Sequence, residues 1–340
     1  MTLDSPSALN VAARRLSKKF LSAWLEAPVR FAFGLRRAGL QRLAEEVLEK
    51  TYASSPYDLP LGSILANVVF DNHQEEFPLG SRERALFLLK TMDISFASRR
   101  VIDAYFENLE AMLQRQERLP TPGIVVLGLG SGRSGSTTMA SLLSTIMGAK
   151  STHENPVPVF WAPHPLQVEF HLRRFRVLSA YFPIVADCSV WWINLAETIT
   201  RALPSTKVIG VYRETEACVR SFRSIMRRSW NPYAHPHNGI WQTYHGDPLR
   251  PHYELPENTR KDPNGARDIM IRQYVTDYNN RLKFLAERTP ERMLLLRTED
   301  LSEPSTRREI SAFLGFHITE VPIHLNVGRM ESNAEGGFWF

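Results

Sequence analysis

Residues 123–138 read GIVVLGLGSGRSGSTT, and this stretch decides the fold. Its first part, Gly123–Leu129, is a continuous apolar run of strand length, which is typical of a strand buried on both faces of a parallel sheet. Its second part, Gly130–Thr138, has the glycine spacing of a phosphate-cradling loop and leads into a helical pattern at Thr137–Ile146. A strand, a glycine-rich loop and a helix in this order predict an anion site, because backbone N–H groups and the helix dipole point positive charge at the loop.

The loop lacks the lysine of a nucleoside-triphosphate loop. That lysine would follow the second glycine directly and reach the β- and γ-phosphates, but this chain has Ser136 there. The cation of the loop, Arg133, lies three residues earlier, and Ser136, Thr137 and Thr138 add hydroxyl donors. The loop therefore favours an anion other than a triphosphate. The plainest alternative is a Gly/Ser turn that binds nothing.

The chain after this loop alternates apolar runs with helical patterns. Lys207–Tyr212 and Arg292–Leu296 are further apolar runs of strand length, and weaker strand candidates occur at Ala149–Thr152 and Pro183–Ala186. The helical patterns between them are Val190–Leu203, Glu216–Met226, Ala266–Glu287 and Ser305–Leu314. This alternation predicts an α/β fold, with three layers (α/β/α), a central parallel sheet and a P-loop-like first turn.

The chain before the loop is helical in pattern. Apolar residues recur every three or four positions in four segments, with Pro-, Asp- and Gly-rich loops at Ser54–Gly62 and Asn72–Ser81. The four segments are Val11–Leu25, Arg36–Leu48, Arg82–Met92 and Arg99–Leu113. A proline-rich joint at Leu119–Gly123 follows. We therefore expect a helical accessory region over 1–120 and an α/β domain over 121–340.

Composition sets broader bounds. The 340 residues are 43% hydrophobic and 23% charged, which is ordinary for a globular protein, and no apolar run is long enough to predict a transmembrane helix. The two cysteines, Cys188 and Cys218, make no disulfide framework, so we expect a reducing, cytoplasmic location.

Charge is concentrated at the start of the chain. Through Ala44 there are eight basic and two acidic residues, and the remainder carries no net positive charge, which argues against nucleic-acid binding. A basic amphipathic start is compatible with peripheral membrane contact, with a transit peptide or with a solvated helix face.

A second anion-binding pattern occurs at Val208–Ser221, VIGVYRETEACVRS. Arg213 ends an apolar run of strand length, and Ser221 follows eight residues later on a helical pattern. A guanidinium fork suits a phosphate, and a hydroxyl on the helix can complete the site.

Together, these two segments resemble the sulfotransferase family. The resemblance covers roughly residues 122–330 and implies 3′-phosphoadenosine 5′-phosphosulfate (PAPS) as co-substrate, with no metal required. It implies that Arg133 contacts the sulfuryl and bridging oxygens, that the loop holds the 5′-phosphate, and that Arg213 and Ser221 grip the 3′-phosphate. The donor-binding residues implied are Gly132, Arg133, Ser134, Gly135, Ser136, Thr137, Thr138, Arg213, Ser221 and Arg329.

The C-terminal part adds two looser resemblances. Leu296–Leu301, with the helical pattern after it, is similar to the strand, acidic turn and helix that close many of these domains. We expect Glu299 and Asp300 to cap a turn or to order neighbouring arginines. Asn326–Arg329 resembles a late basic loop over the 3′-phosphate, and an ordinary tail is the alternative.

The acceptor proton needs a base, and His153-Glu154 follows the weak strand at Ala149–Thr152. The resemblance to bacterial enzymes places an acidic base in this region, so Glu154 is the first candidate and His153 the second. An ordinary turn pair is the alternative. Trp230–Tyr253 holds four histidines among aromatic residues, but their spacing matches no metal motif, so we expect a lid or an acceptor pocket there and no metal site.

These observations predict a PAPS-dependent sulfotransferase that acts on a hydroxyl or amine of a small-molecule, lipid or carbohydrate acceptor. A nucleotide-dependent kinase or other phosphotransferase stays open, although it should carry a loop lysine and Mg²⁺ ligands. A non-catalytic nucleotide-binding module also stays open, as does formation of a homodimer.

Overall fold

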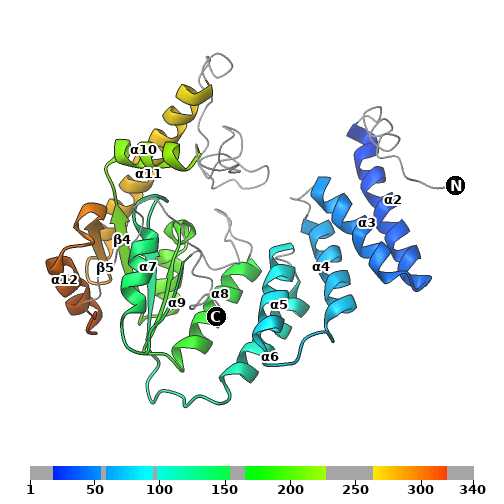
Figure 1. Cartoon of the computed structure of the whole chain (residues 1–340), viewed down its shortest axis with the longest axis horizontal. Coiled ribbons are helices and arrows are strands. Elements are labelled where there is room, and N and C mark those ends of the chain that lie inside the picture. The colour runs from blue at the N-terminus through cyan, green and yellow to red at the C-terminus, as the bar shows by residue number, and fades with distance from the viewer. Residues whose placement is uncertain (1–17, 55–58, 95–97, 154–164, 227–262, 320–340) are drawn as a thin grey trace.

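The computed structural model describes residues 18–54, 59–94, 98–153, 165–226 and 263–319. Five parallel strands form one sheet in the order β2-β3-β1-β4-β5 (Figure 1). The strands are β1 (Ile124–Leu129), β2 (Lys150–His153), β3 (Ile184–Cys188), β4 (Lys207–Tyr212) and β5 (Met293–Arg297). All five strands predicted from the sequence are present, including the two weak ones.

The strand order positions the site. From β1 the chain first builds β2 and β3 on one side, and then crosses to β4 and β5 on the other. In open α/β sheets a ligand crevice forms outside the carboxyl ends of the strands, where the order reverses. Here that point lies between the loop after β1 and the loop after β4, because β1 pairs directly with both β3 and β4.

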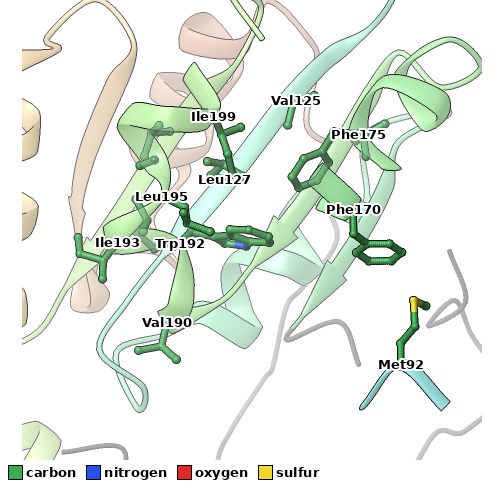
Figure 2. Packing of buried hydrophobic residues seen from close by; sticks show 14 of the residues in the cluster. Met92, Val125, Leu127, Phe170, Phe175, Val190, Trp192, Ile193, Leu195 and Ile199 are labelled. Atoms are coloured by element: carbon green, nitrogen blue, oxygen red, sulfur yellow. The ribbon is translucent and has the colours of Figure 1, made fainter. Parts of the chain in front are cut away.

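Helices cover both faces of the sheet. On one face, α7 (Ser136–Ser144) and α12 (Pro304–Leu314) pack through residues such as Leu143 and Ile310. On the other face lie α8 (Pro165–Ser179), α9 (Ala196–Ala202), α11 (Pro263–Arg288) and the 3₁₀ turn η1 (Val190–Asn194). Trp192 of η1 and Phe175 of α8 are buried against this face (Figure 2). The predicted three-layer α/β/α fold is therefore confirmed.

The N-terminal region is a series of helices, each packed on its neighbours in the chain (Figure 1). They are α2 (Lys18–Arg37), α3 (Gln41–Ser54), α4 (Leu59–His73), α5 (Arg82–Ile94) and α6 (Arg99–Leu113). The first three share a small core that includes Leu48 and Leu65, whereas α5 and α6 contribute to the large core that covers the sheet. The predicted helical character of this region is confirmed.

Several boundaries differ from the sequence predictions. The predicted helix at Arg36–Leu48 is two helices, because Gly39 adopts a left-handed φ of 77° in the turn between α2 and α3. α4 begins inside the predicted loop at Ser54–Gly62. Gly62 lies within this helix, and its lack of a side chain permits the close approach of the carbonyl oxygen of Ile94, which would lie 2.5 Å from a Cβ atom. Neither α4 nor α8 was among the predicted helices.

None of the helices in the described ranges combines the length and apolar character that crossing a bilayer requires. The remaining elements, α10 (Thr215–Met226) and the 3₁₀ turn η3 (Thr298–Asp300), follow β4 and β5 directly and carry residues of the site.

Candidate active site

The loop between β1 and α7 has an unusual backbone. Gly132, Arg133 and Gly135 have φ angles of 77°, 58° and 95°, and Arg133 is the non-glycine residue with a left-handed φ within the described ranges. Gly135 is required for space as well as for its φ, since a Cβ atom there would lie 2.8 Å from Cδ1 of Leu301. Such conformations persist where the surroundings determine them, and they cluster at ligand sites.

The ends of β4 and β5 hold this loop in place. The Arg213 guanidinium donates a hydrogen bond from Nη1 to the carbonyl oxygen of Arg133, at 3.0 Å. The Thr298 hydroxyl lies 2.5 Å from the carbonyl oxygen of Ser134 and 3.1 Å from that of Tyr212, so its one proton is shared between them. The three neighbouring strand ends are therefore fixed to one another at the switch point.

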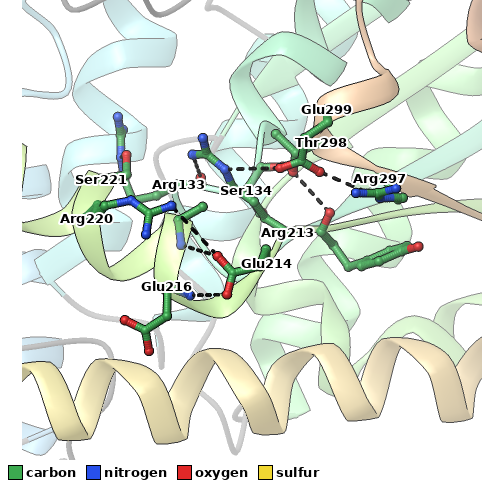
Figure 3. A network of polar contacts seen from close by, with 12 residues as sticks. Arg133, Ser134, Arg213, Glu214, Glu216, Arg220, Ser221, Arg297, Thr298 and Glu299 are labelled. Atoms are coloured by element: carbon green, nitrogen blue, oxygen red, sulfur yellow. Dashed lines mark hydrogen bonds and ion pairs between the residues drawn. The ribbon is translucent and has the colours of Figure 1, made fainter.

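The side chains of the two predicted anchors meet at this point (Figure 3). Arg133 donates from Nε to the Ser221 hydroxyl at 3.2 Å, although the two residues are 88 positions apart in the sequence. Nε of Arg213 lies 3.7 Å from Glu299, which also pairs with Arg297 at 3.9 Å. Glu299 therefore orients neighbouring arginines, as predicted.

α10 is fixed by its own first turn and by α11. The Glu214 carboxylate accepts hydrogen bonds from the backbone N–H groups of Glu216 and Ala217, at 2.8 and 2.7 Å, and so caps the helix. Asn279 of α11 donates to the carbonyl oxygen of Arg213 at 2.9 Å. Ion pairs between Arg272 and Glu216 and between Arg223 and Asp268 join the two helices. These contacts determine where Ser221 lies.

His153 lies at the end of β2, beside the first turn of α7. Its Nε2 atom is 3.0 Å from the Ser136 hydroxyl and 3.3 Å from the Thr137 hydroxyl. Burial lowers the pKa of His153; Asp187 opposes this change and the positive charge of Arg133 adds to it. The imidazole is therefore neutral near pH 7 and, with its proton on Nδ1, can accept a hydrogen bond or a proton at Nε2.

Asp187 is a buried carboxylate at the end of β3 that sequence reasoning missed. One oxygen accepts from the Thr152 hydroxyl at 2.5 Å and the other from the Trp192 indole N–H at 2.7 Å. The sequence signal that could have identified Asp187 is an acidic residue within the otherwise apolar strand segment Ile184–Cys188. In P-loop NTPases an aspartate helps to hold Mg²⁺, whereas here hydrogen-bond donors of the protein engage both oxygens.

The structure brings together most of the predicted site residues. Arg133, Ser221 and Arg213 form one group, and His153 joins the loop through Ser136 and Thr137. Gly132, Ser134, Gly135 and Thr138 lie in the same loop and first helical turn. Glu154, Arg329 and the segment Trp230–Tyr253 lie outside the described residues.

Sequence reasoning also missed Thr298 and Asn279. Each acts on a backbone carbonyl of a distant segment, so neither belongs to a local motif. Within the part of the chain that the structure describes, no group of three or more His, Cys, Asp or Glu side chains is arranged to hold a metal ion.

Fold and site together define a three-layer α/β domain whose lysine-free glycine-rich loop is held by Arg213 at the switch point. The family model of the sulfotransferase domain matches residues 125–324, and the chain belongs to this family of transferases. Among solved structures, it is similar to a sulfotransferase from Alicyclobacillus acidocaldarius, with 15% identity and a TM-score of 0.39, over 63% of this chain and 88% of that one. A search of curated proteins finds no match.

Proposed function

We propose that this sulfotransferase-family protein uses PAPS and moves its sulfuryl group to a hydroxyl or amine of a small-molecule, lipid or carbohydrate acceptor. One observation carries the proposal: the loop cation and the second anchor are in contact. Arg133 donates to Ser221, and Arg213 donates to the backbone of Arg133. A donor with phosphates at two positions suits two adjacent anchors, whereas one phosphate chain would need only the loop.

The residues of the loop fit the 5′ end of such a donor. α7 has no side-chain cap at Gly135 and no acidic residue in its first turn, so its first N–H groups and its dipole are available to an anion. The Ser134 hydroxyl is buried, and a Cβ atom on Gly130 would lie 2.3 Å from it. We therefore expect Ser134 to serve the phosphate through its backbone N–H rather than through its hydroxyl.

The residues of the second anchor fit a 3′-phosphate. Nε of Arg213 has no hydrogen-bond partner within the described residues, although the atom itself is buried. The other N–H groups of this guanidinium can donate to a phosphate oxygen, and the Ser221 hydroxyl can add another hydrogen bond. Asn279 and Glu299 keep the arginine in place for this role.

His153 is the base that the geometry favours. Bound at this site, the donor supplies an activated sulfuryl group, whose bond to the phosphate oxygen breaks as the bond to the acceptor forms. Nε2 of His153 takes the acceptor proton, while Arg133 balances the charge that develops on the phosphate. Glu154 stays a prediction as the alternative base.

Asp187 and Ser136 favour sulfuryl transfer over phosphoryl transfer. A phosphotransferase of this topology needs a loop lysine and a carboxylate that can hold Mg²⁺. Ser136 stands at the lysine position, and both oxygens of Asp187 accept hydrogen bonds from Thr152 and Trp192. Neither residue is arranged for that chemistry.

Calorimetry with 3′-phosphoadenosine 5′-phosphate (PAP), 5′-AMP and ATP tests the donor. We expect PAP to bind at least about tenfold more tightly than 5′-AMP, because the 3′-phosphate adds charge-assisted hydrogen bonds. Labelled PAPS is then screened against hydroxylated and amino acceptors. Tight ATP binding without PAP binding would overturn the proposal in favour of a phosphotransferase. PAP binding without turnover of any acceptor would identify a binding module.

A further inference from the structure

The end of the helical array farthest from the sheet carries an exposed surface that is both apolar and basic. α2 and α3 form this end (Figure 1). Phe31, Phe33, Leu40 and Leu43 are 58%, 43%, 50% and 44% exposed, and they make up half of the large apolar side chains exposed in the described ranges. With the exposed residues Arg30, Arg37 and Arg42 they form what we call the tip surface.

The segment that carries the tip surface is basic. From Ala27 to Ala44 the sequence contains four arginines and no acidic residue. Arg36 pairs with Asp71 of α4 at 3.2 Å and so supports the packing of the helices. The other three arginines belong to the exposed surface. Guanidinium groups next to exposed phenylalanine and leucine side chains have the composition of a surface that binds an anionic, partly apolar ligand.

The arrangement of these side chains indicates a broad ligand. Ala32 of α2 is buried, whereas Arg30, Phe33 and Arg37 recur along one side of the helix and Phe31 projects from another. Among the described elements, α3 is the principal neighbour of α2. The exposed side chains therefore surround the free end of a helical hairpin, and Leu40, Arg42 and Leu43 also line a hollow that they share with Glu46, Asp71 and Glu76.

We propose that the tip surface binds the surface of an anionic lipid bilayer. The arginines would contact lipid phosphates, and Phe31, Phe33, Leu40 and Leu43 would enter the boundary between headgroups and acyl chains. This contact would be interfacial, and none of the described helices is suited to span a bilayer. Two copies of the same arginine-rich surface repel each other, which disfavours self-association through it.

Vesicle flotation with the full chain tests this proposal. The vesicles contain phosphatidylcholine alone or with phosphatidylglycerol, at low and at high salt. We expect binding only to the anionic vesicles and weakening by salt. The double variant Phe31→Ser/Phe33→Ser and the triple variant Arg30→Gln/Arg37→Gln/Arg42→Gln should each reduce vesicle binding by at least about tenfold.

Matched controls separate the tip surface from general effects. Phe284 of α11 is 57% exposed, nearly the same as Phe31, so Phe284→Ser should leave vesicle binding unchanged. The triple variant Arg176→Gln/Arg201→Gln/Arg308→Gln removes the same charge from exposed arginines elsewhere and should also have no effect. Melting temperature and circular dichroism report whether each variant is folded.

Four results would overturn the proposal. They are equal binding to neutral vesicles, no vesicle binding at all, vesicle binding retained by folded tip variants, and dimerisation that the tip variants abolish while no vesicle binds. The third would assign membrane binding to other residues of the chain. The fourth, measured by analytical ultracentrifugation, would identify a second copy as the partner. None of these results depends on which nucleotide the active site uses.

Discussion

At the scale of single residues, Arg213 has two duties that can be separated. Its Nη1 atom holds the loop backbone at Arg133, and its guanidinium also forms part of the proposed 3′-phosphate site. Lysine keeps the charge but loses the fork, so Arg213→Lys should weaken PAP binding by about tenfold or more. The affinity for 5′-AMP, which lacks the 3′-phosphate, should fall by a smaller factor, because only the contact with the loop backbone is lost for this nucleotide.

Calorimetry with both nucleotides gives the ratio of PAP affinity to 5′-AMP affinity, and this ratio shows whether Arg213 contacts the 3′-phosphate. Arg201, an exposed arginine of α9, provides the matched control Arg201→Lys, which should bind both nucleotides as the wild type does. A parallel loss of PAP and 5′-AMP affinity in Arg213→Lys would mean that Arg213 only clamps the loop.

His153 makes a prediction about pH. Burial lowers the pKa of His153, and the charge of Arg133 adds to this effect while Asp187 opposes it. The neutral imidazole, which can accept a proton, therefore persists below pH 6.5, the ordinary pKa of histidine. The acidic limb of kcat/KM should therefore fall at a pH below 6.5, with no loss of activity between pH 8 and that limb. His153→Gln should lower kcat by about a hundredfold or more and leave PAP affinity nearly unchanged.

Rate profiles of the wild type and the variant test this assignment. If His153→Gln kept its turnover and an acidic limb, the base would be another group, and Glu154→Gln would be the next variant to measure. Ser136 contacts the same ring nitrogen, but the acidic limb of the rate profile comes from the imidazole. Ser136→Ala should therefore keep the acidic limb.

At the scale of elements, the turn into α7 depends on a glycine. Gly135→Ala must adopt a φ near 95° and also place a methyl group 2.8 Å from Leu301. We expect a loss of about 2 kcal/mol of folding free energy and weaker PAP binding, because the loop and the first helical turn must shift. Gly315→Ala is the control: its φ is 78°, but nothing lies within 4 Å of the added Cβ.

Urea unfolding and calorimetry distinguish the two variants. Gly315→Ala should cost about 1 kcal/mol, from its backbone conformation alone, and should bind PAP normally. Equal costs for the two substitutions, with unchanged PAP affinity in both, would show that the Leu301 contact does not constrain the loop.

The elements that sequence could predict are those whose signal is local. β1, the loop and α7 follow from consecutive residues, because strand burial, glycine spacing and helix start all lie within Gly123–Thr138. The short strand β3 follows from its apolar residues Ile184–Ala186, whereas β2, Lys150–His153, has no apolar residue and is predicted only weakly. α8 was not, because its buried face carries the polar residues Gln167, His171 and Arg174, which obscure the apolar period.

The contacts that complete the site are non-local and could not be predicted in this way. Thr298 reaches Ser134 across 164 positions, and Asn279 reaches Arg213 across 66. The pairing of Arg213 with Ser221 was predictable as a pattern, whereas the contact between Arg133 and Ser221 needed the strand order. The resemblance to bacterial enzymes ranked Glu154 before His153, whereas the contacts of His153 with Ser136 and Thr137 favour His153.

At the scale of the whole molecule, the helical region and the sheet share one core. Tyr105 and Phe106 of α6 pack against Phe170 of α8, with ring centroids 5.2 and 5.5 Å apart. Phe170→Ala should lower the free energy of unfolding by about 3 kcal/mol or more. It should also reduce cooperativity between the two regions, which calorimetric unfolding measures as a broader or divided transition. Phe284→Ala, at an exposed position, should do neither.

The stability of the helical array should depend on pH through His73. Its Nε2 atom lies 2.9 Å from Glu45 of α3, and its Nδ1 atom lies 2.6 Å from Glu76. Burial alone would lower the pKa of His73, but the hydrogen bonds and charges of Glu76 and Glu45 outweigh it and raise the pKa above 6.5. Protonation therefore favours the folded state. The stabilisation is complete below pH 6.5 and is lost as pH rises through the raised pKa, with a size below about 1 kcal/mol for a partly exposed group.

Urea unfolding at pH 6 and pH 8.5 should show this loss of stability in the wild type and not in His73→Gln, whereas the substitution of the exposed His317 by Gln should preserve the loss. An identical pH dependence in wild type and His73→Gln would mean that other groups couple the array to pH.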